Sequence, residues 1–157
     1  MPSVPTVNGY RRLAAEFSLS PSAIDWKHEN RTAMLRVLGA GRTIHVENRI
    51  GEPCANPYLM IAGQLGAGLE GLEQRLGESG AASRSGTLPA TLAEALEIFR
   101  DSDHVRRLLG EPLTACLTRL KESETGRFEA WRAGRPGDPE PAAGVTEWEH
   151  REYFGVY

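Results

Sequence analysis

One stretch constrains the fold of this chain more than any other: residues 43–58, which read TIHVENRIGEPCANPY. Apolar and polar residues alternate over its first five positions, a pattern that predicts a strand. Asn56 and Pro57 predict a helix start, with Asn as the N-cap and Pro at the first helical position. Glu47 and Arg49 lie two residues apart, so in a strand both side chains point to the same face. The stretch therefore predicts a strand, a turn and a helix that present one acid and one base side by side.

Two further strands are predicted before this stretch. Residues 23–37 alternate in polarity on both sides of 30–32 (Asn-Arg-Thr), which indicates a strand, a turn and a second strand. The connection at 39–41 (Gly-Ala-Gly) is short enough for a hairpin, so the strand over 43–48 should lie antiparallel to the second strand. We therefore expect a short antiparallel sheet of about three strands.

About five helices are expected after the sheet. The first runs from Asn56 to about Leu76, with Gly77 as its C-cap, and its apolar residues recur every three or four positions. Residues 77–87, rich in Gly, Ser and Ala, indicate a loop. Capping boxes at 91–94 and 146–149 predict two more helix starts. The stripe of the first helix, which we expect to be core, consists of Leu59, Ala62, Leu65, Leu69, Leu72 and Leu76.

A short helix over 102–109, stopped by Gly110, and a long helix over 112–133 complete the prediction. The fold class is therefore α+β, a short antiparallel sheet followed by helices. The side of the long helix expected to be buried carries Leu113, Cys116, Leu117, Leu120, Phe128 and Trp131.

Composition narrows the class of function. The net charge of −3 argues against a nucleic-acid partner, because nucleic-acid platforms are usually basic. No apolar run approaches membrane-spanning length and the first residues do not resemble a signal peptide, so we expect no membrane partner. Cys54 and Cys116 lack the spacing of a disulfide framework or a metal site, which favours the cytoplasm.

Several short motifs follow one another in a fixed order that resembles the C-terminal part of the catalytic domain of glutamine synthetases. The Gly-Glu-Pro at 51–53 is more similar to the amine-using branch of that family. The resemblance runs from about Pro5 to Tyr157, so it implies that residues 1–157 are a partial catalytic domain without the N-terminal β-grasp domain and the first catalytic segments. The motifs are Asn-Gly-Tyr-Arg-Arg at 8–12, Asn-Arg-Thr at 30–32, Glu-Asn-Arg at 47–49, Ala-Asn-Pro-Tyr-Leu at 55–59 and Ala-Gly-Leu-Glu-Gly-Leu at 67–72.

The resemblance implies roles for five residues. Arg12 and Arg49 would bind the substrate glutamate, and Glu47 would bind Mg²⁺ or Mn²⁺. Arg31 and Arg36 would bind the phosphates of ATP, with Arg31 also at the reacting groups and hence catalytic. Guanidinium groups suit the charge that develops in phosphoryl transfer, and a carboxylate suits a hard cation. From the residues alone, a plainer interpretation stays open: solvated strand arginines and a surface ion pair.

Two positions depart from the family pattern. Leu19 stands where the ammonia-using enzymes carry a glutamate that closes over the site, and Glu16 could replace it only if the loop refolds. His45 stands where many relatives have a nucleotide-contacting arginine, and we assign it no role. These departures favour either a larger, more apolar amine or an inactive site.

Two functions stay open. The first is an ATP-dependent glutamate–ammonia or glutamate–amine ligase of nitrogen metabolism, acting through γ-glutamyl phosphate. It would need the missing N-terminal half or other glutamine-synthetase-like subunits. The second is a non-catalytic remnant, or an interaction module that associates with intact glutamine-synthetase-like subunits. A neighbouring reading frame for the missing half would favour the first.

Overall fold

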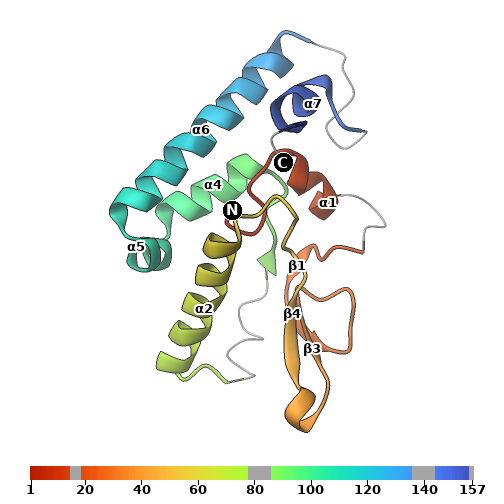
Figure 1. Cartoon of the computed structure of the whole chain (residues 1–157), viewed down its shortest axis with the longest axis vertical. Helices are drawn as coiled ribbons and strands as arrows, with labels where there is room; N and C mark the ends of the chain where they lie inside the picture. The colour runs from red at the N-terminus through yellow and green to blue at the C-terminus, as the bar shows by residue number, and fades with distance from the viewer. Residues whose placement is uncertain (15–18, 78–85, 136–143, 156–157) are drawn as a thin grey trace.

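The computed structural model describes residues 1–14, 19–77, 86–135 and 144–155 (Figure 1). Its described part is α+β, with short sheets of two and three strands and five helices after the larger sheet, as the sequence predicts. The elements are η1 (Asn8–Tyr10), α1 (Arg11–Ala14), β1 (Ala23–Ile24), β2 (Trp26–His28), β3 (Leu35–Leu38), η2 (Gly41–Thr43), β4 (His45–Asn48), α2 (Pro57–Glu73), β5 (Gly86–Thr87), α4 (Leu92–Asp101), α5 (Asp103–Leu109), α6 (Glu111–Ala133) and α7 (Glu147–Tyr153).

The larger sheet has the order β2-β3-β4. β3 and β4 are antiparallel, which confirms the predicted hairpin, but β2 lies parallel to β3, so the all-antiparallel expectation is wrong there. The reason is the route of the chain around Asp25. Its carbonyl accepts from the amide of Leu35 at 3.0 Å and its carboxylate accepts from the amide of Met34 at 2.8 Å. These bonds bring the start of β3 beside the start of β2.

A second sheet pairs β1 with β5, and the amide of Leu88 extends it by donating to the carbonyl of Ser22 at 2.9 Å. β5 falls inside the segment 77–87 that the sequence marks as loop, so that prediction is wrong for Gly86 and Thr87. The stretch 78–85 lies outside the described residues.

The main core lies where the N-terminal segment meets α4, α6 and α7 (Figure 1). Thr91 caps α4 by accepting from the amide of Glu94, as predicted. The rings of Phe128 on α6 and Trp148 on α7 lie 5.0 Å apart. The buried apolar residues of this core are Val4, Tyr10, Leu13, Leu92, Ala95, Leu96, Phe99, Phe128 and Trp148.

Helix α2 begins as predicted, because the Asn56 side chain accepts from the first free amides of the helix. It ends at Glu73, and Arg75 rather than Gly77 adopts the left-handed conformation after it, with φ 52°. The predicted core stripe is also wrong: no residue of α2 is buried in the described structure. Helix α5 packs on this helix through Leu108 against Gly66, while Leu65, Leu69, Leu72 and Leu76 are exposed.

Helix α6 turns a different side inward from the one its leucines predict. Its buried residues are Thr114, Thr118, Glu124 and Phe128, whereas Leu113, Cys116 and Leu120 are exposed. The helix is oriented by Glu124, whose carboxylate contacts the N-terminal segment and α7. Among the described residues, no helix is long and apolar enough to cross a membrane.

Candidate active site

The β3–β4 pairing places Arg36 directly opposite Glu47. Their side chains form an ion pair of 3.3 Å between NH1 and Oε2, and Arg36 also contacts Glu29 at 3.5 Å. The Arg36 side chain is 15% exposed, and its Nε is buried without a hydrogen-bond partner among the described residues. A buried donor without an acceptor costs free energy, so an acceptor that reached it, such as a phosphate oxygen, would bind favourably.

Arg49 follows β4 and extends the same ladder, because its amide donates to the carbonyl of Met34 at 2.9 Å. Its NH2 donates to the carbonyl of Leu19 at 3.0 Å, and its buried NH1 has no partner in the described part of the chain. By strand alternation, Arg49 lies on the same sheet face as Glu47. Arg36, Glu47 and Arg49 are therefore brought together on one face.

Arg12 comes from helix α1 and reaches the turn that follows β4. Its NH2 donates to the carbonyls of Ile50 and Gly51 at 2.5 and 3.1 Å, and its NH1 donates to that of Arg49 at 3.4 Å. The two arginines predicted to bind glutamate thus meet at one turn, although they are 37 positions apart in sequence.

Arg31 lies in the loop between β2 and β3 and is exposed. The loop is shaped by Asn30, whose side-chain oxygen accepts from the amide and the hydroxyl of Thr32 at 2.8 and 2.7 Å. The guanidinium of Arg31 makes no ion pair or hydrogen bond to the residues that the structure describes. The structure therefore does not join Arg31 to the Arg36–Glu47 pair.

The residues fit only part of a metal site. Glu47 is half-exposed and offers hard oxygen ligands on a strand. In the described ranges, however, no group of three His, Cys, Asp or Glu side chains could hold a metal ion. Within the described residues, Glu47 therefore does not form a metal site with neighbouring side chains.

The two departures from the family pattern have plain structural counterparts. Leu19 is 75% exposed, and its backbone carbonyl accepts a hydrogen bond from Arg49. The His45 ring is exposed on β4, with Nδ1 2.9 Å from the carbonyl of Thr43. Glu16 lies outside the described residues, so its prediction stays untested.

Sequence reasoning missed the contacts that hold Arg12 in place. Its neighbour Arg11 forms a bidentate pair with Glu149 on α7, with Nε–Oε1 2.6 Å and NH2–Oε2 2.5 Å. Glu149 is also the last residue of a capping box, accepting from the amide and hydroxyl of Thr146. Burial alone would raise the pKa of Glu149, but the hydrogen bonds from Arg11 and Thr146 lower it overall. The sequence predicts the capping box, but it does not predict that Glu149 also pairs with Arg11.

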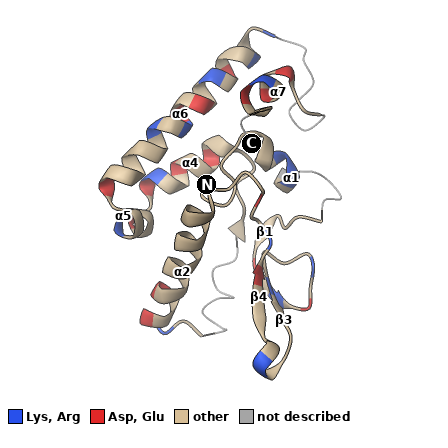
Figure 2. Cartoon of the chain, viewed as in Figure 1, with Lys and Arg blue, Asp and Glu red and all other residues tan. Residues whose placement is uncertain are grey.

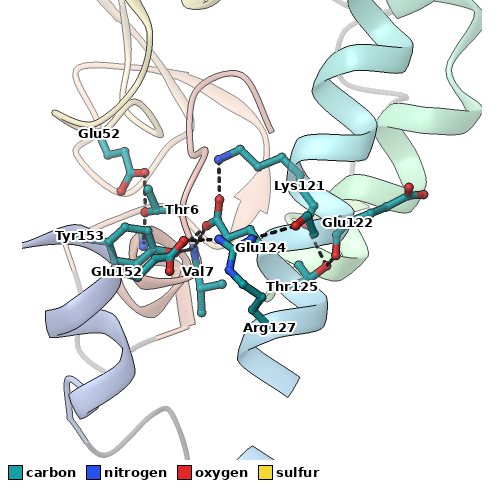
Figure 3. A network of polar contacts seen from close by, with 12 residues as sticks. Thr6, Val7, Glu52, Lys121, Glu122, Glu124, Thr125, Arg127, Glu152 and Tyr153 are labelled. Atoms are coloured by element: carbon teal, nitrogen blue, oxygen red, sulfur yellow. Dashed lines mark hydrogen bonds and ion pairs between the residues drawn. The ribbon is translucent and has the colours of Figure 1, made fainter. Parts of the chain in front are cut away.

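A second network ties the N-terminal segment to α6 and α7 (Figure 3). The Tyr153 hydroxyl donates to Glu124 at 2.5 Å and accepts from the amide of Val7 at 2.9 Å. Lys121 contributes an ion pair of 2.7 Å to the same carboxylate. Burial, followed by the hydrogen bond and the charge of Glu124, raises the pKa of Tyr153.

Glu52 joins the turn after β4 to the N-terminal segment (Figure 3). It accepts from the Thr6 hydroxyl at 3.1 Å, and it approaches Gly9 so closely that a Cβ there would overlap the carboxylate. Burial raises the pKa of Glu52, and this outweighs the hydrogen bond from Thr6 and the charge of Arg12. Glu52 is therefore a structural carboxylate beside the turn at 49–51 that Arg12 contacts.

Comparison with known proteins identifies the family of the chain. Residues 3–134 match the model of the glutamine synthetase catalytic domain. A gamma-glutamylanilide synthase of Acinetobacter sp is 38% identical over 98% of this chain and 32% of its own length. A gamma-glutamylethanolamide synthetase of Streptomyces coelicolor is 35% identical, over 96% and 31%. A glutamine synthetase of Thermococcus kodakarensis is 34% identical, over 97% and 37%. The chain spans about a third of the length of these relatives, and it belongs to the glutamine synthetase family as part of a catalytic domain.

Proposed function

We propose that this chain supplies one edge of the active site of an ATP-dependent glutamate–amine ligase. In this reaction the γ-carboxylate of glutamate attacks the γ-phosphorus of ATP, giving γ-glutamyl phosphate and ADP. An amine or ammonia then attacks the acyl carbon, phosphate leaves, and the nitrogen loses a proton. The observation that carries the proposal is the single sheet face holding Arg36, Glu47 and Arg49, on which two buried guanidinium nitrogens lack protein acceptors in the described chain.

Each residue has a role that its contacts support. Arg36, held by its ion pair with Glu47, would bind a phosphate oxygen through its unused Nε. Arg31 would approach the transferring phosphoryl group from its exposed loop. Arg49 and Arg12, fixed at the same turn, would bind the carboxylate of glutamate. Glu47 would be one ligand of Mg²⁺ or Mn²⁺, which neutralises phosphate charge when bound.

The amine is proposed to be larger and more apolar than ammonia. Leu19 projects into solvent next to Arg49, at the position where the resemblance places a proton-accepting glutamate. An apolar side chain there can contact an organic amine but cannot take a proton from ammonium. Two of the relatives are named for anilide and ethanolamide products.

The proposed site is incomplete on this chain, because the described residues hold no group of three His, Cys, Asp or Glu side chains that could bind a metal ion. We therefore propose that residues 1–157 act as part of a catalytic domain that the rest of a glutamine-synthetase-like chain, or another such subunit, completes. The free thiols of Cys54 and Cys116 fit a reducing cytoplasm. The alternative, a non-catalytic module that associates with intact subunits, is favoured by the lost glutamate at Leu19.

The test is glutamate-dependent phosphate release from ATP, with Mg²⁺ or Mn²⁺ and hydroxylamine as the amine. The chain is assayed alone and joined to the part of the Acinetobacter relative outside the matched stretch. Glu47→Gln should abolish release in the joined form. Glu29→Gln is the matched control, because Glu29 contacts the same arginine but is 66% exposed. Loss in both variants, or in neither, would contradict the assignment of Glu47. A folded joined form without release would favour the non-catalytic module.

A further inference from the structure

Helix α2 carries a continuous apolar surface that nothing in the described structure covers. We name it the α2 face: Tyr58, Ile61, Leu65, Leu69 and Leu72, which are 83, 52, 64, 61 and 76% exposed. Their spacing of three and four residues puts them on one side of the helix. The helix has no charged residue before Glu70, in contrast to the charged surface of α6 (Figure 2).

The helix cannot turn to bury this face against its own chain, because its adjacent side is fixed to α5. Leu108 packs on Gly66, where an added Cβ would overlap it. The carboxylate of Glu70 binds the His104 ring and, at 3.0 Å, the Arg107 guanidinium. Rolling the α2 face inward would break all of these contacts. A large apolar patch held toward water in this way marks an interaction surface.

The neighbouring sheet is uncovered in the same manner. Ile44 and Val46 are 59 and 60% exposed, and alternation puts them on the sheet face opposite to Glu47. Figure 1 shows α2 and this sheet extending from the same end of the molecule, away from α6 and α7. One body lying at that end could cover both apolar surfaces and reach the edge of the site.

We propose that the α2 face is the surface on which the rest of a glutamine-synthetase-like catalytic domain docks, whether it is joined to this chain or separate. The inference rests on the proposed function. The chain spans about a third of the length of its relatives, so about two thirds of a relative's chain has no counterpart in it. An uncharged leucine face suits the apolar interior of such a domain. A second copy of this chain is a less suitable partner for the α2 face, because that copy would bring the same incomplete set of metal ligands.

The experiment co-expresses this chain with the part of the Acinetobacter relative outside the matched stretch, and measures the complex by sedimentation and its affinity by titration. The wild-type chain should form a one-to-one complex. Leu65→Gln should weaken it about tenfold to a hundredfold, because one leucine loses its apolar burial. Leu120→Gln on α6 is the matched control: that leucine is 59% exposed, and its loss should change the affinity less than about twofold. Both leucines are exposed, so neither change should alter the unfolding of the isolated chain.

Equal affinities for wild type and Leu65→Gln would overturn the proposal, and so would a larger effect of Leu120→Gln. Dimers of the isolated chain that Leu65→Gln dissociates would assign the face to a second copy instead. If the separate remainder is insoluble, the two parts are fused and hydroxyl-radical labelling of Leu65 is compared with that in the isolated chain. A fall of at least about fivefold supports docking, whereas unchanged labelling overturns it. A complex that depends on Leu65 but releases no phosphate would contradict the ligase assignment and leave docking intact.

Discussion

The two ends of this molecule differ in how completely they bury their apolar residues. At one end, α4, α6, α7 and the N-terminal segment bury a shared core (Figure 1). Two polar networks join these elements: one around Glu124 (Figure 3) and one formed by Arg11 and Glu149. At the other end, α2 buries none of its residues, and β4 leaves Ile44 and Val46 in solvent. The difference shows that hydrophobic sequence and burial are separable: α2 is more apolar than α4 and α6, yet it has no buried residue while they do.

The candidate site residues are divided unequally between the two ends. The packed end contributes Arg12 and holds it through its neighbour Arg11, while the open end carries Arg36, Glu47 and Arg49. The proposed site therefore takes residues from both ends of the molecule. The contrast therefore predicts where substitutions will unfold the chain and where they will not.

The largest expected effect tests the contrast directly. Phe99→Ala, at a residue 3% exposed on α4, should lower the free energy of unfolding by about 3–5 kcal/mol, because it leaves a cavity in the main core. Leu65→Ala on α2 should change it by less than about 0.5 kcal/mol, since a surface residue loses little on truncation. Urea denaturation of both variants measures the difference. Similar losses would mean that α2 is covered within the chain itself.

The next prediction concerns the ion pair that joins α1 to α7. Glu149→Gln should lower the free energy of unfolding by about 3 kcal/mol at pH 7, because it leaves the Arg11 guanidinium buried without its counter-charge. The folded state lowers the pKa of Glu149, so its contribution is present above the unfolded value of about 4.5 and is lost as pH falls through the folded pKa. Denaturation from pH 7 to 3 should show the wild type and the variant converging in acid. A gap independent of pH would contradict the assignment.

Much of the fold and part of the site followed from local sequence. Caps at Asn56, Thr91 and Thr146 marked helix starts, because a cap is a contact within one turn. Glu47 and Arg49 could be placed on one face in the same local way, because residues two apart in a strand point to the same side. Periodicity could show that α2 has an apolar side, but whether that side is core depends on what covers it.

Long-range contacts could not be predicted in this way. Nothing local distinguishes Glu149 as a cap from Glu149 as the partner of Arg11, which is 138 positions away. Likewise, α6 turns Thr114 and Glu124 inward instead of its leucines because Glu124 contacts Val7 and Tyr153. The motif order named the candidate arginines, while only the structure showed that Arg12 meets the turn at Arg49 and that Arg36 pairs with Glu47.

A smaller effect is expected at the second network of the packed end. Tyr153→Phe removes the hydroxyl that donates to Glu124 and accepts from Val7. It should lower the free energy of unfolding by about 1–2 kcal/mol, because a buried carboxylate loses one of its donors. Amide hydrogen exchange should also become faster at Val7. Faster exchange in α2 but not at Val7 would show that the packed end does not depend on this bond.

The smallest effect is expected at Glu52, which lies where the two ends meet. Its contribution to stability depends on pH in the opposite direction to that of Glu149. Glu52→Gln keeps an acceptor for Thr6 and removes a charge. Burial raises the folded pKa of Glu52, so the favourable contribution of its neutral form is present below about 4.5 and is lost as pH rises through the folded pKa. The variant should therefore match the wild type in acid and be more stable at pH 7, by no more than about 1 kcal/mol. Thermal unfolding at several pH values measures this, and a loss of stability at pH 7 would show that charged Glu52 is needed beside Arg12. Because Glu149 and Glu52 act with opposite signs, the double variant should show a flatter dependence of stability on pH than either single variant.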